Sequence, residues 1–309
     1  MTSHENRSGR LLAMAVATVA CLCLSHGATT LWASDAAKDA SANKVMTNPF
    51  FALGNGVAGP GFETSAAKAA LLAELDYDGI GPSGVVGIAE MLEALDRHGL
   101  AMHVLYIGVK IDADQRKFDP RLKDVIKTLK GRPTIIWLHV TGGRGEAKSP
   151  QADARAVEII REVADMAEDS GLRVALYPHY AFYVETVDDA LRVAEKVDRK
   201  NVGITFNVCH CLRNGNGENI PSLLKRAMPR LMVVTINGAD QKGGWDRLIQ
   251  TLDRGQFDMR EFLKTVHRLG FTGPIGLQCY GIKGDTRQNL TRSMRAWQEL
   301  KSISPAGTE

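Results

Sequence analysis

The amino-acid sequence predicts a (β/α)8 barrel, in which eight parallel strands form a closed ring inside a layer of helices. From residue 50 onward, short apolar runs alternate with longer segments of helical spacing, which is typical of parallel βαβ units. Eight such pairs fill residues 49–303, and this length suits one closed barrel better than a doubly wound open sheet. Glycines recur where a helix has to stop before the next strand, as at Gly99, Gly131, Gly171 and Gly270.

The eight apolar runs are the predicted strands. In chain order they cover residues 50–57, 77–81, 101–107, 134–140, 173–177, 202–207, 231–237 and 274–279. The segments between them carry apolar residues at helical spacing, for example in 67–75, 88–95, 157–164 and 262–269. A last helix is expected within residues 285–302.

The N-terminus predicts export. Arg7 and Arg10 precede an apolar run over residues 11–24, and small residues follow it, as in a secretory signal peptide. The run is shorter than the roughly 20 residues that span a bilayer, so we expect cleavage and no membrane span. The predicted division is a signal peptide at 1–36, a flexible linker at 37–48, the barrel at 49–303 and a tail at 304–309. The protein is then periplasmic or secreted; a lipoprotein attached at Cys21 and a short buried helix are the alternatives.

The amino-acid composition limits the classes of binding partner that the sequence favours. With 38 Lys and Arg against 35 Asp and Glu, the net charge of +3 is too small to favour a nucleic-acid partner. Three cysteines follow the predicted signal, namely Cys209, Cys211 and Cys279, and we interpret them as packing residues. The sequence gives no signal for an oligomeric state.

The candidate site residues follow from the barrel itself, because such barrels carry their working residues at the C-terminal ends of the strands. The polar and aromatic residues there suit hydrogen bonding and ring stacking with a polyhydroxylated ligand. We predict catalytic roles for His179, His210 and Tyr177. The predicted substrate-binding residues are His139, Asn207, Asn237, Gln278, Tyr280, Arg254 and Lys283, of which Arg254 and Lys283 would suit an anionic group.

Three segments resemble the xylose isomerase-like TIM barrel superfamily, which includes sugar phosphate isomerases and ketose epimerases. Residues 201–210, NVGITFNVCH, are similar to its sixth-strand signature, which ends Asp-x-x-His. Residues 174–179, VALYPH, resemble its fifth strand, which usually ends Glu-Asn-His. Residues 273–278, GPIGLQ, resemble its last strand, which usually ends in Glu. The resemblance covers roughly residues 50–301.

The resemblance also implies a divalent metal held by Glu, Asp, His and Glu. At those positions this chain has Tyr177, Asn207, Thr235 and Gln278, all of them neutral. A hard cation needs anionic or several carbonyl oxygens, so we predict no metal at this place and no other cofactor. A zinc ion held by His139, His179 and His210 is the alternative.

The resemblance implies an isomerase, an epimerase or an elimination lyase that acts on a sugar. Such enzymes abstract a proton next to a carbonyl, which requires a base and a group that stabilises the enolate oxygen. His179 and His210 are the predicted bases or acids, because imidazole titrates near neutral pH. The alternative is a carbohydrate-binding barrel without catalysis. An endonuclease-like function is disfavoured by the charge and by the export signal.

Overall fold

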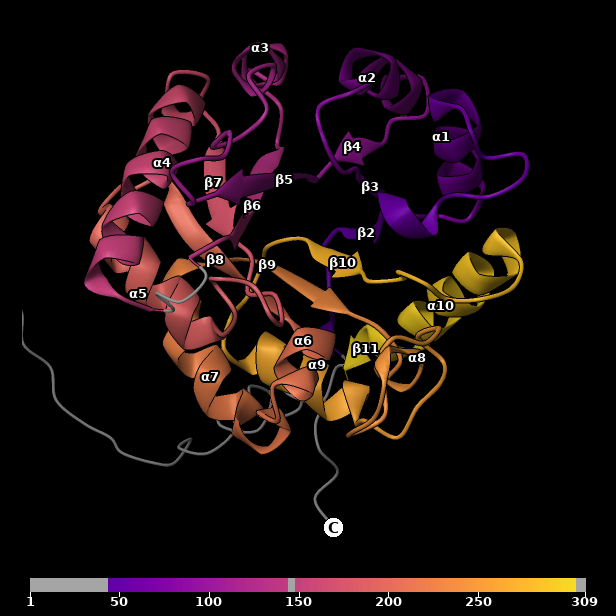
Figure 1. The fold of residues 1–309 in the computed structure, drawn as a ribbon. Helices are drawn as coiled ribbons and strands as arrows, with labels where there is room; N and C mark the ends of the chain where they lie inside the picture. Colours follow the sequence, from indigo (N-terminus) through magenta and orange to yellow (C-terminus); the bar gives the residue numbers. More distant parts are fainter. Residues whose placement is uncertain (1–43, 144–147, 304–309) are drawn as a thin grey trace, which may run out of the picture. The chain divides into compact units, whose positions relative to one another are not determined.

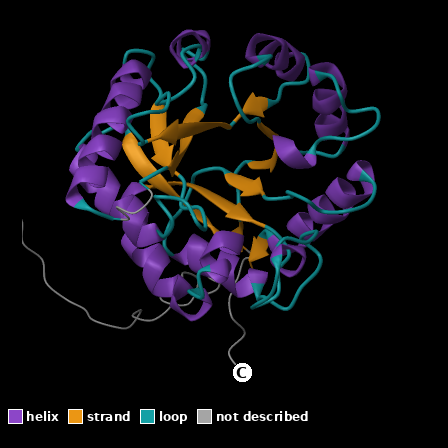
Figure 2. Cartoon of the chain, in the orientation of Figure 1, coloured by secondary structure: helices purple, strands orange, loops and turns teal. Residues whose placement is uncertain are grey.

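The computed structural model describes residues 44–143 and 148–303. Its central sheet has nine strands, and every neighbouring pair is parallel (Figures 1 and 2). The strand order is β4-β3-β2-β10-β9-β8-β7-β6-β5. The two end strands, β4 (Ala101–Met102) and β5 (Val104–Lys110), are consecutive pieces of one predicted strand with only His103 between them. The ring is therefore the predicted (β/α)8 barrel.

All eight predicted strands are present, most of them shorter than the apolar runs that predict them. The other strands of the barrel are β2 (Phe50–Leu53), β3 (Gly79–Gly81), β6 (Ile135–Thr141), β7 (Arg173–Leu176), β8 (Val202–Asn207), β9 (Leu231–Ile236) and β10 (Ile275–Leu277). The α-helices are α1 (Ser65–Glu74), α2 (Ile88–Asp96), α3 (Leu122–Thr128), α4 (Pro150–Glu168), α5 (Val187–Val197), α6 (Val208–Arg213), α7 (Ile220–Ala227), α8 (Trp245–Leu248), α9 (Met259–Arg268) and α10 (Thr286–Leu300).

Local sequence signals set the ends of several helices. Thr64, Ser149, Thr186 and Asp285 each accept a backbone N–H with their side chain at a helix N-terminus. Gly99, Gly131, Gly171 and Gly270 have φ of 67°, 77°, 70° and 81°, the left-handed conformation that ends a helix. These glycines are the predicted punctuation between the helices and the strands that follow them.

Two apolar cores lie on either side of the strands. The larger one packs the outer faces of the strands against the helices. The smaller one fills the barrel interior and includes Phe51, Val104, Trp137, Tyr177 and Val233. The Trp137 indole donates a 3.0 Å hydrogen bond to Thr205 Oγ1, so its polar atom is satisfied inside this core.

Residues 44–48 of the predicted linker (37–48) belong to the described part of the chain and are ordered against the barrel. Lys44 and Val45 form β1, which pairs antiparallel with β11 (Ser302–Ile303). Met46 is buried, and Asn48 Nδ2 donates to the carbonyls of Phe271 and Gly273. The predicted signal peptide at 1–36 and the tail at 304–309 lie outside the described residues. Within residues 44–143 and 148–303, no helix is long and apolar enough to cross a membrane.

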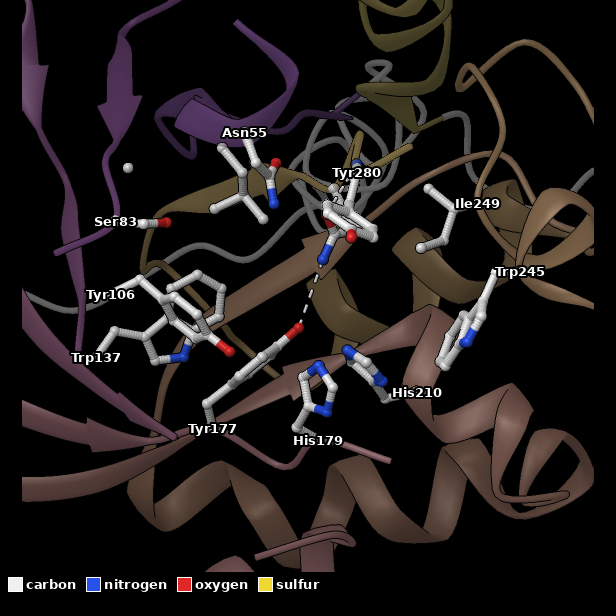
Figure 3. Close-up of a pocket in the computed structure, with 13 residues that line it drawn as sticks. Asn55, Ser83, Tyr106, Trp137, Tyr177, His179, His210, Trp245, Ile249 and Tyr280 are labelled. Carbon is white, nitrogen blue, oxygen red and sulfur yellow. Dashed lines mark hydrogen bonds between the residues drawn. The ribbon is translucent and has the colours of Figure 1, made fainter. Parts of the chain in front are cut away.

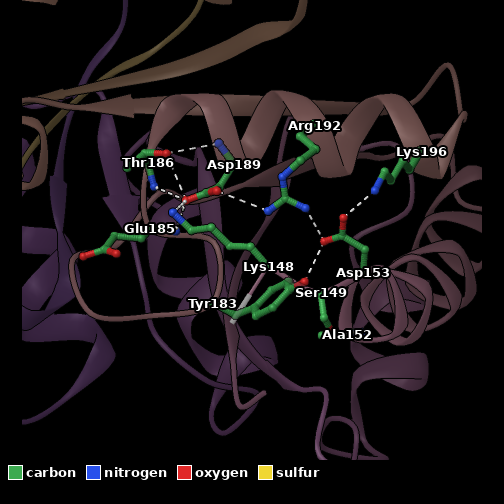
Figure 4. Close-up of polar contacts among 10 residues, drawn as sticks. All are labelled: Lys148, Ser149, Ala152, Asp153, Tyr183, Glu185, Thr186, Asp189, Arg192 and Lys196. Carbon is green, nitrogen blue, oxygen red and sulfur yellow. Dashed lines mark hydrogen bonds and ion pairs between the residues drawn. The ribbon is translucent and has the colours of Figure 1, made fainter. Parts of the chain in front are cut away.

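An ionic cluster joins α4 to α5 on the outside of the barrel (Figure 4). Asp153, 3% exposed at its side chain, is paired with Arg192 and Lys196 and accepts a 2.6 Å hydrogen bond from the Tyr183 hydroxyl. Arg192 also reaches Asp189, which Lys148 contacts at 3.3 Å. Because Tyr183 belongs to the loop between β7 and α5, the cluster fixes one end of the loop that carries His179.

Candidate functional site

A cavity of about 300 Å³ opens at the C-terminal ends of the strands (Figure 3). Its floor is aromatic and consists of Tyr106, Trp137 and Tyr177, whose rings contact one another edge to face. The remaining lining residues are Leu53, Asn55, Gly81, Ser83, His179, His210, Trp245, Ile249, Gln278 and Tyr280. Among the described residues that line it, none is Arg, Lys, Asp or Glu.

His179 enters the cavity from the loop that follows β7. Its ring stacks on Phe182 with the centroids 3.8 Å apart, and its Nδ1 lies 2.8 Å from the carbonyl oxygen of Tyr180. The backbone N–H of His179 donates to the Val184 carbonyl, which closes the loop. The imidazole is therefore held on one face and at one nitrogen, and it has little freedom to rotate.

His210 enters from α6, whose N-terminus is set by Asn207. The Asn207 Oδ1 accepts the backbone N–H of His210 at 3.2 Å, which is the ordinary N-cap arrangement. His210 is 4% exposed, and its Nδ1 accepts the backbone N–H of Tyr180 at 3.3 Å. The centroids of the His179 and His210 rings are 4.0 Å apart.

The Tyr177 ring lies edge-on to both imidazoles, with its centroid 5.7 Å from that of His179 and 5.4 Å from that of His210, and two amide groups contact its hydroxyl. Asn207 Nδ2 donates to this hydroxyl at 2.8 Å, and Gln278 Nε2 donates at 3.5 Å. Both amides are held in this orientation, because Asn207 Oδ1 accepts from His210 N and Gln278 Oε1 accepts from Tyr280 N at 3.1 Å. As the hydroxyl accepts these N–H groups, its own proton is left for a group in the cavity.

Burial keeps all three histidines of this region neutral near pH 7. It lowers the pKa of His179, although the hydrogen bond to the Tyr180 carbonyl opposes the shift. It lowers the pKa of His210 far below its ordinary value, and the nearby His179 adds to the effect. Burial, with a smaller effect of His179, also lowers the pKa of His139 to about 4. The same desolvation raises the pKa of the Tyr177 hydroxyl, which stays protonated.

The loop after β9 supplies an aromatic wall. Trp245, 37% exposed, lies edge-on to the His210 ring with the centroids 5.3 Å apart. Asn237 Nδ2 donates to the carbonyls of Gly238 and Leu248, at 2.8 and 2.7 Å, and so ties the two ends of this loop together. Asn237 thus acts on the cavity through the loop rather than by lining it.

The structure brings five of the ten predicted site residues into the cavity wall, namely Tyr177, His179, His210, Gln278 and Tyr280. Asn207 lies directly behind Tyr177. The His139 ring stacks on Tyr106 at 4.4 Å in the room left by Gly108, where a Cβ would come within 2.7 Å of His139 Nε2. Arg254 lies in a separate groove beside α9 and α10, and Lys283 is exposed.

Several lining residues were not among the predicted ones. Asn55 and Ser83 follow the first two strands, a position that is itself a signal for a site in a barrel. Tyr106 and Trp137 lie within strands, where an aromatic residue is interpreted as part of the core unless its height in the barrel is known.

Gly54, Gly56 and Gly59 have the spacing of a dinucleotide-binding loop, but α1 begins only at Ser65, so no helix N-terminus follows them directly.

Whether the side chains near the cavity could hold a metal ion depends on which of their atoms face one another. Between residues 44 and 303, the gap at 144–147 excepted, no three His, Cys, Asp or Glu side chains are grouped so as to hold a metal ion. At the positions that the resemblance assigns to metal ligands, amide N–H groups of Asn207 and Gln278 point at the Tyr177 hydroxyl, while their oxygens face backbone N–H groups. Thr235 Oγ1 is buried in β9 without a hydrogen-bond partner.

Comparison with known proteins gives the same fold. A partial match, 24% identical over 127 residues, links 40% of this chain to 42% of an uncharacterised protein of Methanocaldococcus jannaschii, so it spans less than half of that relative. The 3-keto-D-glucoside 4-epimerase YcjR of E. coli is similar with a TM-score of 0.64 at 17% identity, over 82% of this chain and 99% of that one. The D-allulose 3-epimerase of a Methylomonas species has a TM-score of 0.66 at 15% identity, over 84% and 99%. At such identities the likeness concerns the fold.

The family assignment rests on the sequence itself. The profile of the family described as "Xylose isomerase-like TIM barrel" matches residues 69–300, which include every strand of the barrel from β3 to β10. This chain belongs to the xylose isomerase-like TIM barrel family.

Proposed function

We propose that this protein is an exported enzyme that isomerises, epimerises or eliminates on an uncharged carbohydrate by removing a proton next to a carbonyl, without a divalent metal. The observation that carries the proposal is the pair of neutral imidazoles, His179 and His210, beside the Tyr177 hydroxyl in the cavity. Such a set offers both a base and hydrogen-bond donors for an enolate oxygen, which are the two requirements of this chemistry.

The lining supports an uncharged substrate. A phosphate or a carboxylate would need cationic partners to offset its desolvation, and the described lining residues include neither Lys nor Arg. The predicted anion-binding residues Arg254 and Lys283 do not line the cavity. Aromatic faces together with amide and hydroxyl groups suit a neutral sugar, whose C–H faces pack on rings and whose hydroxyls accept and donate hydrogen bonds.

The donor set does not fit the metal of the family. A hard cation requires oxygen donors directed at one point. Here the oxygens of Asn207 and Gln278 are occupied by backbone N–H groups, and their N–H groups converge on Tyr177 instead. The export part of the proposal rests only on the basic, apolar and small-residue pattern of residues 1–36.

A second candidate is a carbohydrate-binding barrel without turnover. The exposed faces of Trp245 and Tyr280 at the rim favour it, since such aromatic residues bind sugar rings in the absence of any catalytic group.

Exchange of carbon-bound protons distinguishes the enzyme from the carbohydrate-binding barrel. The protein is incubated in D2O with neutral aldoses, ketoses and glycosides and with their phosphates, and carbon-bound deuterium is measured by NMR. We expect exchange with at least one neutral sugar and none with a phosphate, in the wild type and in the exposed control variant His98→Gln. Saturable binding without exchange identifies the binding barrel, and the absence of both binding and exchange contradicts either function.

A further inference from the structure

The backbone of a single residue, Tyr180, contacts both imidazoles of the cavity. Its carbonyl oxygen lies 2.8 Å from His179 Nδ1, and its N–H lies 3.3 Å from His210 Nδ1. A carbonyl oxygen only accepts a hydrogen bond, and a backbone N–H only donates one. In the neutral state, His179 therefore carries its proton on Nδ1, whereas His210 has an unprotonated Nδ1 and carries its proton on Nε2.

The Nε2 atoms of both rings face the cavity side of the pair. Neither has a hydrogen-bond partner among the described residues, and both residues line the cavity next to the Tyr177 hydroxyl (Figure 3). The ligand thus meets an unshared electron pair on His179 and an N–H on His210. Two identical side chains, with their centroids 4.0 Å apart, present opposite chemistry.

The Tyr180 turn that imposes this arrangement is itself fixed. Ala181 follows Tyr180 at φ +63°, a left-handed conformation that is uncommon for a residue with a Cβ. The Glu185 Oε1 accepts the Ala181 N–H at 3.0 Å, and the Phe182 N–H donates to the His179 carbonyl. The Tyr180 peptide groups consequently keep their direction relative to both rings.

From this geometry we infer that His179 is the base of the reaction and that His210 and Tyr177 together form a metal-free site for the enolate oxygen. The inference rests on the proposed function. His179 Nε2 takes the proton from the carbon next to the carbonyl. The C–H electron pair forms the new C=C bond, and the carbonyl π electrons move to oxygen, where His210 Nε2–H and the Tyr177 O–H hold the charge.

In an isomerisation, His179 then returns the proton to the former carbonyl carbon, and the proton of the neighbouring hydroxyl passes to the enolate oxygen as the new carbonyl forms, so that no oxidant, reductant or second substrate is consumed. His210 acts as a hydrogen-bond donor rather than as a full acid, because a neutral imidazole that gives up its proton would become an unstable anion. A neutral imidazole in this role is a known way of polarising a carbonyl. The amide N–H groups of Asn207 and Gln278 on the Tyr177 oxygen favour the same direction of charge.

The first test reads the tautomers directly, in the full chain without any sugar. Nitrogen-15 NMR of labelled histidine distinguishes protonated from unprotonated ring nitrogens, and the signals are assigned with His179→Gln and His210→Gln. We expect protonated Nδ1 on His179 and protonated Nε2 on His210 at pH 7. The same tautomer on both rings, or the reverse assignment, overturns the inference whether or not the protein turns over a sugar.

The second test uses amides of two lengths as matched variants. The Gln amide reaches the place of Nε2, and the Asn amide reaches only that of Nδ1. His210→Gln keeps an N–H for the oxyanion and should lose about ten-fold less exchange activity than His210→Asn, which should lose on the order of 10²–10³. At His179 neither amide is a base, so Gln and Asn should be equally damaging, each by about 10²–10⁴.

Ligand affinity and thermal stability are measured for every variant, so that loss of folding is recognised. His179→Gln with the exchange rate of the wild type overturns the role of the base, and equal losses in the two His210 variants overturn the role of the donor. A wild type that exchanges no sugar proton contradicts the proposed function, whereas the tautomers are still decided by NMR. The failures of the two proposals are therefore distinguishable.

Discussion

Three of the polar side chains in and next to the cavity wall are oriented by backbone groups close to them in sequence. Asn207 accepts the N–H of His210 three residues later, Gln278 accepts the N–H of Tyr280 two residues later, and His179 contacts the carbonyl of the next residue. Contacts of this range need no distant partner. They orient these side chains, while the closed barrel brings the ends of their strands together around one cavity.

His139, which we predicted to bind the substrate, instead packs inside the barrel. It fills a space beside Gly108 and stacks on Tyr106, with Nδ1 buried and without a partner. No sequence pattern separates such a histidine from a catalytic one, because both occupy the end of a strand. The difference lies in the neighbouring strand, where the glycine in register leaves room for the ring.

We predict that His139 makes the fold sensitive to acid. Its pKa is lowered from 6.5 to about 4, first by burial. Below pH 6.5 the His139 side chain takes up a proton in the unfolded chain, but in the folded chain it does so only below about pH 4. The free energy of unfolding therefore falls as the pH decreases from 6.5 to 4. The loss reaches up to about 3 kcal/mol and is absent above pH 6.5.

Urea denaturation between pH 7.5 and pH 4 measures this effect. In His139→Gln, which cannot take up a proton, the decline should be shallower, although the variant starts from a lower stability because a buried ring is lost. His98→Gln, at an exposed position, should follow the wild type. Parallel curves for His139→Gln and the wild type would refute the assignment.

At the scale of elements, the strands were predictable and the loops were not. Every apolar run became a strand because a barrel strand is buried on both faces. Some runs are longer than their strands: residues 54–56 form a 3-10 turn after β2, and Tyr77, at the start of its run, hydrogen-bonds the Leu290 carbonyl instead of joining β3. The path of the β9–α8 loop depends on Asn237 reaching Leu248, eleven residues away, which no periodicity encodes.

The cluster between α4 and α5 anchors one of these loops through Tyr183 (Figure 4). Burial by itself would raise the pKa of Asp153, but hydrogen bonds from Arg192, Lys196 and Tyr183 outweigh it and hold this pKa at about 2. Asp153 therefore stabilises the fold above pH 4, and this contribution is lost as the pH falls from about 4 toward 2.

We predict that Asp153→Asn destabilises the protein by about 2–3 kcal/mol at pH 7, because two cations and a tyrosine lose a buried charged partner. The matched control is Asp165→Asn, which removes the carboxylate from the half-exposed Arg199 pair on the same helix and should cost less than about 1 kcal/mol. Chemical denaturation at pH 7 compares the two. Equal losses would show that the cluster contributes no more than a surface ion pair.

At the scale of the whole molecule, the barrel positions the residues of the cavity, and the proposed chemistry belongs to His179, His210 and Tyr177. The fold was predicted from the strand pattern, and the family from three segments that resemble its strand signatures. The match of the family profile to residues 69–300 confirms the family. The four neutral residues at the family's metal positions were also visible in the sequence. That the amide N–H groups of Asn207 and Gln278 converge on the Tyr177 hydroxyl was not visible there, because the direction of an amide depends on which backbone groups reach it in three dimensions.

The central claim is that enolisation in this cavity is carried out by neutral side chains without a divalent metal. Its most direct test is the rate of deuterium incorporation into a neutral sugar before and after exhaustive treatment of the full chain with a chelator, followed by addition of Mn, Mg, Co or Zn. We predict one rate under all of these conditions. A rate that disappears with the chelator and returns with one of the metals would contradict the claim.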